Sequence, residues 1–348
     1  MKPETIKENA AESRLTSLER ENSRQRDEIN RLRRTSDNLR RELEGCESRI
    51  EEVLNSVPAF TPTIIKTRAK PKPSEATAVA CWSDWHYEER IDPKTIHGLN
   101  EHSRSICTDR VKLLVSKTLE QVRMFRSVHK IKKIVVWLGG DMISGDIHDE
   151  LLETCEVPPA VAVVEVSQLI ADSIETICRE GEFDEIEIVC NDGNHSRTTK
   201  KLRVAMRTGH SWEWVMYSML ANGFRKYPRM RWIIADGEQV IHPIQGRDWR
   251  FLHGDTIRYQ GGVGGLTIPA NKAVSQWNKA RPCYHTVFGH WHQRTPHRWW
   301  TTNGSSVGYS PFAQAIKAEY EPPMQSLIIC DDSGIRQNTA IQLATGTV

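Results

Sequence analysis

The chain has 348 residues, a formal net charge of +2 with His neutral, 26% charged residues and 38% hydrophobic ones. This composition is typical of a soluble globular protein, and the length allows one large core plus an appendage. The sequence holds no run of about 18 apolar residues and no secretory signal at its start, so we expect a cytoplasmic protein without a membrane span.

The eight cysteines lie at positions 46, 81, 107, 155, 178, 190, 283 and 330 and show no C-x-x-C spacing. We therefore expect reduced thiols rather than a disulfide framework or a zinc knuckle. They are predicted to be buried packing residues.

The segment from Thr5 to Val57 is rich in Glu and Arg and contains neither Pro nor an aromatic residue, which predicts a long helix. Most heptad positions a (Leu15, Asn22, Ile29, Ser36, Leu43, Ile50) and d (Leu18, Gln25, Leu32, Leu39, Cys46, Val53) are apolar. In a parallel pair, Arg14 would meet Glu19, Glu21 would meet Arg26, Glu28 would meet Arg33, and Glu42 would face Glu47. The polar Asn22 at position a favours two strands. We predict that residues 1–57 form a parallel dimeric coiled coil, which makes the protein a homodimer or a higher oligomer; a solvated single helix is the alternative.

Residues 58–75 are predicted to be an extended basic linker. Pro58, Pro62, Pro71 and Pro73 break any helix, and they are mixed with Lys66, Arg68, Lys70 and Lys72. We expect a globular domain at residues 76–348 to follow.

This domain alternates between strand-like and helix-like segments. Apolar and β-branched runs at 77–82, 133–138, 185–190, 249–252 and 284–288 have the length and composition of strands. Helices are expected at 109–128, 159–179 and 211–226, the second with Pro159 at its start. After Met230 the pattern changes to short strands, including further ones at 231–235, 239–244, 298–302 and 325–330. The alternation predicts a layered α/β domain.

Five polar motifs follow five of these strands. They are Asp84-Trp85-His86, Gly139-Gly140-Asp141, Gly193-Asn194-His195, His253-Gly254-Asp255 and His290-Trp291-His292. In open α/β sheets, ligands bind in loops beyond the carboxyl ends of strands, so these motifs can converge on one site. Neutral imidazoles are good ligands for Zn, Mn or Fe. Taken singly, each His is equally a core or surface imidazole, and each Asp a strand-end cap.

The ordered set D-x-H, G-D, G-N-H, H and G-H-x-H resembles the calcineurin-like metallophosphoesterase superfamily over residues 76–310. The resemblance implies an α/β fold of two mixed β-sheets sandwiched by helices, and the strands after Met230 fit the second sheet. It also implies two divalent metal ions. Asp84, His86 and His292 would hold the first ion, Asn194, His253 and His290 would complete the second, and Asp141 would bridge them.

The same resemblance implies hydrolysis of a phosphate ester by a water that both ions activate, with His195 as proton donor or transition-state contact. The motif positions offer nitrogen and oxygen ligands without Cys, so Mn, Fe, Zn and Mg are all possible, and we expect Mn. Most family members continue G-N-H with Asp or Glu, which can orient the histidine. Here Ser196 follows, so either another carboxylate takes that role or His195 is a weaker acid.

A basic run directly after the G-N-H motif favours a polyanionic substrate. It comprises Arg197, Lys200, Lys201, Arg203 and, further on, Arg207. These cations either contact successive phosphates of a nucleic acid or form a solvated loop. Trp299 and Trp300 are candidates for base stacking or for the core. His148 is either a substrate contact or a solvated loop residue, and the glycines of 261–265 either let the backbone approach a phosphate or form a flexible loop.

The run G-N-H-S-R-T-T-K-K and the later N-G-S-S-V-G-Y at 303–309 are similar to bacteriophage-encoded phosphoesterases identified as DNA repair exonucleases. This similarity implies a dimeric DNA nuclease, in the host cytoplasm if phage-encoded. The related repair nucleases work beside a coiled-coil ATPase. The chain has no G-x-x-x-x-G-K-[ST] run, so an ATPase partner would be a separate chain.

Two other functions remain open. One is a phosphatase or cyclic-nucleotide phosphodiesterase on the same dimetal core. Asp141 is followed by Met-Ile-Ser-Gly rather than by the Asp-Arg-Gly of protein Ser/Thr phosphatases, which disfavours that class. The other is an assembly protein with an inert site, against which the complete set of seven ligand side chains argues.

Overall fold

The computed structural model of the chain describes residues 3–56, 64–65, 73–258, 265–315 and 317–344. Most of the predicted linker at 58–75, and residues 261–264 of the glycine run, lie outside the described residues. The chain divides into two compact units, Met1–Pro71 and Lys72–Val348.

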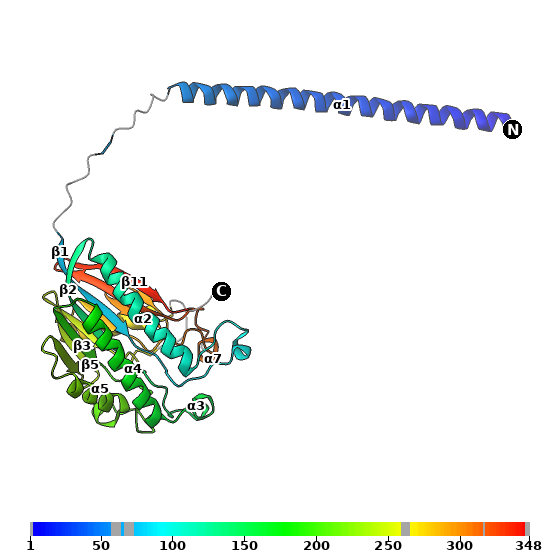
Figure 1. Cartoon of the computed structure of the whole chain (residues 1–348). Coiled ribbons are helices and arrows are strands. Elements are labelled where there is room, and N and C mark those ends of the chain that lie inside the picture. Colours follow the sequence, from blue (N-terminus) through cyan, green and yellow to red (C-terminus); the bar gives the residue numbers. More distant parts are fainter. Residues whose placement is uncertain (1–2, 57–63, 66–72, 259–264, 316, 345–348) are drawn as a thin grey trace. The chain divides into compact units, whose positions relative to one another are not determined.

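The first unit contains the long helix α1 at Pro3–Ser56, which confirms the predicted N-terminal helix (Figure 1). At 1.5 Å per residue it is about 80 Å long. Its apolar a and d side chains, called the α1 seam here, are Leu15, Leu18, Ile29, Leu32, Leu39, Leu43, Ile50 and Val53. Each is 50–62% exposed within one chain. Burial of these apolar side chains against a partner helix would be favourable, because it removes apolar surface from water. The dimer itself stays a prediction.

The second unit is built on a six-stranded sheet with the order β11-β10-β1-β2-β3-β4. Its strands are β1 (Ser74–Trp82), β2 (His129–Leu138), β3 (Glu185–Cys190), β4 (Met230–Ile234), β10 (Met324–Asp331) and β11 (Gly334–Gln342). Strands β1 to β4 are parallel, β10 runs antiparallel to β1, and β11 runs antiparallel to β10.

The register of the parallel strands brings three motif loops to one edge. Trp82 pairs with Leu138, Leu138 with Cys190, and Cys190 with Ile234, so these strands end level with one another. Because each strand ends at this edge, the loops that follow β1, β2 and β3 leave the sheet together.

A five-stranded sheet with the order β5-β6-β7-β9-β8 packs against the first. Its strands are β5 (Gln239–Ile244), β6 (Arg247–Leu252), β7 (His285–Phe288), β8 (Thr295–Pro296) and β9 (Trp300–Thr302). The assignment of every strand after Met230 to this sheet was wrong. β4 extends the first sheet beside β3, and β10 pairs with β1. These long-range pairings leave no local signal in the strand sequence.

Side chains of the first sheet alternate between two cores, as the two-residue period of a strand requires. Helices α2 (Arg104–Phe125), α4 (Pro159–Glu180) and α5 (Trp212–Gly223) cover one face (Figure 1). Ala78 and Ala80 of β1 face these helices. Val79 and Cys81 face the second sheet, where they share a core with Phe251. The outer face of the second sheet packs on α6 (Thr267–Ala280). Two mixed sheets flanked by helices confirm the predicted fold class.

Several elements differ from the predicted bounds. α2 begins at Arg104 rather than at residue 109, because Ser103 caps it by accepting a hydrogen bond from the Ile106 N–H. β9 begins at Trp300 rather than at residue 298. The sequence analysis missed α6, β8, β11, the short helices α3 (Asp149–Thr154) and α7 (Pro311–Ala315), and the 3₁₀ turns η1 (Pro93–Ile96) and η2 (Thr208–His210).

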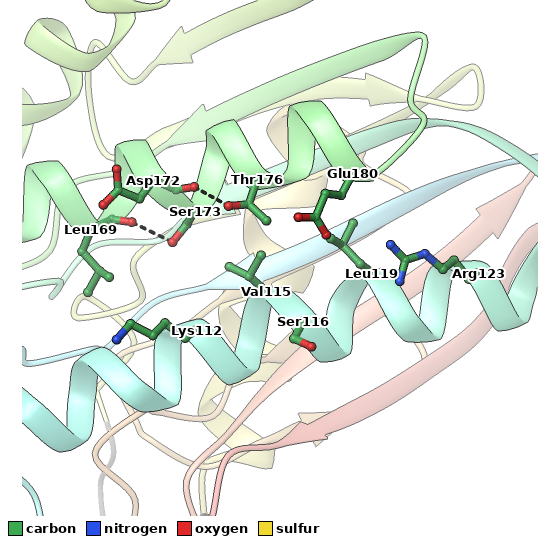
Figure 2. Close-up of a pocket in the computed structure, with 10 residues that line it drawn as sticks. All are labelled: Lys112, Val115, Ser116, Leu119, Arg123, Leu169, Asp172, Ser173, Thr176 and Glu180. Atoms are coloured by element: carbon green, nitrogen blue, oxygen red, sulfur yellow. Dashed lines mark hydrogen bonds between the residues drawn. The ribbon is translucent and has the colours of Figure 1, made fainter.

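A surface groove runs between α2 and α4, which lie side by side (Figure 2). Its hydroxyl groups are bonded within their own helix: Ser173 Oγ donates to the Leu169 carbonyl and Thr176 Oγ1 to the Asp172 carbonyl, each at 2.7 Å. All of its lining residues come from these two helices and include no motif residue. The groove is therefore separate from the site that the motifs form.

All eight cysteines are free thiols, as expected. Five are buried, but Cys46 is exposed on α1, and Cys155 and Cys283 are half-buried. The prediction of burial was therefore wrong for these three. Among the described residues, no helix has both the length and the apolar content needed to cross a membrane.

Candidate metal centre

Five of the predicted ligands have left-handed backbone conformations. The φ angles are 55° at Asp84, 43° at His86, 51° at Asp141, 70° at His290 and 55° at His292. Non-glycine residues adopt this region rarely, and they do so mainly at functional sites where the surrounding structure holds them there. Here the holding bonds include Asp84 N–H to the Gly140 carbonyl (2.9 Å) and His86 N–H to the Asp141 carbonyl (3.1 Å).

The first ligand cluster consists of Asp84, His86 and His292. Nε2 of His86 lies 3.1 Å from Nε2 of His292, which in turn lies 3.5 Å from Oδ1 of Asp84. Two imidazole nitrogens that face each other so closely need a proton or a cation between them. Burial lowers the pKa of His86 well below its usual value, with His195 and His292 adding to the effect. A neutral His86 is the form that binds a metal ion.

The carboxylate of Asp84 is fixed from both sides. Its Oδ1 accepts a hydrogen bond from the His290 N–H at 2.9 Å, and its Oδ2 accepts one from the Ser83 hydroxyl. The hydrogen bond from His290 therefore joins the loop after β7 to the loop after β1, and it holds the candidate ligands of the two loops close together.

The second cluster consists of Asp141, His253 and His290, with Asn194 beside it. Nδ1 of His253 donates to the Gly139 carbonyl at 2.8 Å. Its Nε2 faces two oxygens, Oδ2 of Asp141 at 2.9 Å and Oδ1 of Asn194 at 3.1 Å. Burial lowers the pKa of His253, but the Asp141 carboxylate outweighs it and raises that pKa to about 10. A proton on Nε2 and a metal ion are thus alternative occupants of the same position.

Asp141 connects the clusters, because it belongs both to the group with His253 and His290 and to a group with His86 and His195. Its side chain is fully buried. Oδ1 accepts the His195 N–H at 2.8 Å, and Oδ2 is buried and lies 2.9 Å from Nε2 of His253. Burial favours the neutral acid, yet the adjacent His253 and His195 hold the pKa of Asp141 well below its usual value. A buried, ionised carboxylate between two sets of imidazoles fits a pair of divalent cations.

His195 lies beside this shared carboxylate, with its ring 4.8 Å from the ring of His86. Nδ1 of His195 is 2.8 Å from the Ser144 carbonyl oxygen, which can only accept, so Nδ1 carries a proton. Burial lowers the pKa of His195, an effect that Asp141 partly offsets. Nε2 is therefore the ring nitrogen of His195 that can gain or lose a proton.

The seven predicted metal ligands and His195 thus converge on one site, in the arrangement that the metallophosphoesterase resemblance predicts. Comparisons with known proteins add little to this. No model of a protein family matches the chain, and no curated protein sequence matches it.

Solved structures show weak likenesses. A single mutant of Vps29 from Entamoeba histolytica is 14% identical over 50% of this chain and 88% of its own, with a TM-score of 0.28. Vacuolar Protein Sorting 29 from Cryptosporidium parvum is 11% identical over 77% and 99%, with a TM-score of 0.31. The sulfate thiohydrolase SoxB from Thermus thermophilus, in complex with glycerol, is 11% identical over 79% and 57%, with a TM-score of 0.31. At these values the likenesses assign no activity.

Two buried glutamates that the sequence analysis missed hold the motif loops. Glu213 accepts hydrogen bonds from the backbone N–H of Met142 (2.6 Å) and of Gly193 (2.7 Å), which joins the loops after β2 and β3. Glu88 accepts from the N–H of Ser144 (3.0 Å) and of Gly145 (2.8 Å). Burial raises the pKa of Glu88 to about 7 and that of Glu213 to about 8. Neither residue belongs to a motif, so the sequence patterns did not point to them. The one local indication is that Glu88 lies two residues after His86, a predicted ligand.

The predicted substrate-binding residues divide into two groups. Lys200, Lys201 and Arg203 are exposed, as a phosphate-binding track requires. Arg197 is half-buried, and its guanidinium donates to the carbonyls of Asn194 (2.8 Å) and Thr199 (3.1 Å), so it supports a metal ligand. The Arg197 guanidinium is therefore bonded to the backbone of its own loop, and its role as a substrate contact stays a prediction.

One further expectation needs correction, and one open alternative is resolved. Arg207 is buried and binds Asp192 and Asp255, with the closest N–O distance 2.8 Å to Asp255, so it does not extend the basic run. Trp300 is also buried, and its Nε1 donates to Asn271, which makes it a core residue.

The metal centre opens into a pocket of about 310 Å³. Beside the ligands, this pocket is lined by α3, α7 and the loop after β1. His148 is one of its lining residues, and its ring lies 5.8 Å from that of His195. His148 is therefore an exposed loop residue that also lines the pocket.

Proposed function

We propose that this protein is a metal-dependent phosphodiesterase that uses two divalent ions, most readily Mn²⁺, and acts on DNA as a dimeric nuclease. The observation that carries the proposal is the position of Asp141, which is shared between ligand groups on both sides. When bound, two divalent ions supply a water nucleophile at neutral pH and positive charge against the phosphate oxygens. Nitrogen and oxygen ligands without thiolates suit Mn, Fe, Zn or Mg.

The chain's own residues have distinct roles in this reaction. Asp84, His86 and His292 would hold one ion, and Asn194, His253 and His290 the other. In its imidazolium form, which the lowered pKa makes the minor form at neutral pH, His195 would donate the proton on Nε2 to the oxygen that leaves phosphorus. Its Nδ1–H would stay bonded to the Ser144 carbonyl.

Two features support DNA as the substrate. The exposed cations Lys200, Lys201 and Arg203 follow the G-N-H loop directly and can contact backbone phosphates. The α1 seam would pair two chains, so one substrate could be held by two catalytic units. A separate ATPase partner remains part of the proposal.

A second candidate is a phosphatase or cyclic-nucleotide phosphodiesterase on the same dimetal core. The enclosed pocket favours it, because about 310 Å³ is the size of a site for a small ligand. Lys200, Lys201 and Arg203 do not line that pocket.

The deciding experiment compares substrates and a ligand variant. The protein and Asp141→Asn would be incubated with Mn²⁺ and labelled single-stranded DNA, double-stranded DNA or bis-p-nitrophenyl phosphate. Asp236→Asn, an exposed aspartate outside the motifs, is the matched control. We expect Mn²⁺-dependent cutting of DNA by the wild type and by the control, with loss of bound metal and activity in Asp141→Asn. Hydrolysis of the small diester without cutting of DNA would favour the second candidate, and no hydrolysis at all would favour an inert scaffold.

A further inference from the structure

We infer that the pocket beside the metal centre binds the terminal nucleoside of the substrate, with its base against Phe312 and no further phosphate beyond it. This inference rests on the proposed phosphodiesterase activity, and it names the group on one side of the scissile phosphate.

One wall of the pocket is apolar and aromatic. It is formed by Pro311, Phe312 and Ala315 of α7 and by Leu151 of α3. The Phe312 side chain is 53% exposed, so it is not part of the hydrophobic core and its ring is available to a ligand in the pocket. An aromatic face at a ligand site binds bases by stacking, at about 1–3 kcal/mol per base.

The wall is held against the metal centre by backbone hydrogen bonds. The Arg90 N–H donates to the Thr154 carbonyl at 3.0 Å, and the Glu156 N–H donates to the Glu88 carbonyl at 2.8 Å. These bonds tie the C-terminal end of α3 to the loop that carries the first candidate ligands. The α3 part of the wall is therefore joined directly to the loop after β1.

The polar lining of the pocket disfavours a second phosphate. Glu89 and Glu150 both line it, and Arg90 is the lining guanidinium. Glu89 is only 18% exposed, and its Oε2 lies 3.8 Å from Nδ1 of His86. Both groups can accept hydrogen bonds from sugar hydroxyls or base amino groups. Burial raises the pKa of Glu89 to about 7, so the repulsion of the next phosphate of a continuing strand comes mainly from the Glu150 carboxylate.

The enclosed shape leads to the same conclusion. A pocket of about 310 Å³ closed by α3 and α7 can hold one nucleoside but cannot admit a duplex. The strand would then extend from the other side of the phosphate. Cleavage would therefore occur one nucleotide from a strand end.

The test uses two diesters with the same leaving group, thymidine 5′-(p-nitrophenyl phosphate) and methyl p-nitrophenyl phosphate, with Mn²⁺ and the full chain. We expect Phe312→Ala to lower kcat/KM for the thymidine diester by about 5- to 150-fold, the equivalent of one stacked base. The methyl diester should change less than about twofold, because its substituent does not reach α7. Trp214→Ala is the matched control, since Trp214 is 38% exposed and does not line the pocket.

Two more substrates test the charge and the class of the bound group. A 3′-phosphate added to the thymidine diester should raise KM about fivefold, and Glu150→Gln should reverse part of that increase. Benzyl p-nitrophenyl phosphate should bind more weakly than the thymidine diester. If it binds as tightly, the pocket takes apolar groups in general and the nucleoside assignment is wrong.

The outcomes separate the inference from the proposed function. Hydrolysis of both diesters with no effect of Phe312→Ala overturns the inference and leaves the phosphodiesterase activity intact. Hydrolysis of neither by the wild type overturns both. If Phe312→Ala folds poorly, Phe312→Leu keeps an apolar side chain at this position, and unchanged hydrolysis of the methyl diester shows that the metal centre is intact.

Discussion

Nδ1 of His195 donates a 2.8 Å hydrogen bond to the carbonyl oxygen of Ser144. This bond fixes the imidazole without an acidic neighbour in the chain. Ser196, which stands where an acidic residue was expected, instead contacts the Gly193 carbonyl and the Ser211 hydroxyl. The Ser144 peptide is in turn held by Glu88. The Ser144 carbonyl therefore orients the His195 ring directly, and the buried Glu88 carboxylate does so indirectly by holding Ser144 in place.

If His195 donates a proton to the leaving oxygen, the fall in kcat caused by replacing His195 should depend on how much the leaving group needs that proton. We expect His195→Asn to lower kcat on DNA by about 10²- to 10⁴-fold. The loss on bis-p-nitrophenyl phosphate should be under about tenfold, because p-nitrophenolate leaves without a proton. Steady-state kinetics on both substrates, with bound Mn measured by mass spectrometry, would check this. Equal losses on the two substrates with metal retained would show that His195 stabilises the transition state instead, and loss of metal would show that it acts as a ligand. Ser196→Ala should leave both rates near the wild-type values.

The close approach of Gly193 to Asp141 gives a second prediction. A Cβ at Gly193 would overlap both the side-chain oxygen and the backbone nitrogen of Asp141. Gly193→Ala must therefore displace the shared carboxylate, and we expect Mn²⁺ affinity to fall at least about tenfold to 100-fold. Isothermal titration with Mn²⁺ measures this. Gly209→Ala is the control, since a Cβ there meets no atom within 4 Å. Unchanged Mn²⁺ affinity in Gly193→Ala would argue against Asp141 as the bridging ligand.

Local sequence patterns were sufficient for much of the fold and for the ligands. β3 and β5 have the predicted bounds because their runs are compact and bounded by turn residues. The candidate ligands were assigned from the resemblance of five ordered motifs. Each motif follows a strand end, so the sheet brings these side chains together.

Residues that act through distant partners could not be found in this way. Glu213 contacts N–H groups of two loops, one of them 71 positions away. β10 pairs with β1 across most of the chain, so nothing in its own sequence distinguishes the first sheet from the second. Arg207 looked like part of a basic surface, and its burial depends on Asp255, 48 positions further on.

A buried ion network at the edge of the first sheet predicts acid sensitivity. Glu187 is 6% exposed and binds His242 (2.7 Å), Lys133 (2.9 Å) and Arg231. Burial would raise the pKa of Glu187, but its bonds to His242 and Lys133 lower it to about 2. Because the folded-state pKa is below the ordinary 4.5, the network stabilises the protein above that pH, and this contribution is lost as pH falls towards 2.

We therefore expect Glu187→Gln to lower the free energy of unfolding by about 2 kcal/mol at pH 7. The difference from wild type should shrink between pH 5 and pH 3, as urea titrations at each pH would show. Glu185→Gln should cost less than about 0.5 kcal/mol, since Glu185 binds the same Lys133 but is 66% exposed. A constant difference across this pH range would mean that the charge of Glu187 does not matter.

The α1 seam predicts that two chains associate in parallel. Within one chain its leucines and isoleucines are at least half exposed, and in a coiled coil they would enter holes on the partner helix. Replacing Leu32 and Leu39 with Glu places charges in the seam, so we expect a dimer to become a monomer in light scattering. Asn30→Glu with Asn38→Glu adds the same charge outside the a and d positions and should leave the dimer intact. The two variants differ in seam position rather than in net charge, so equal dissociation of both would point to a charge effect, and dimers in both would place the interface outside α1.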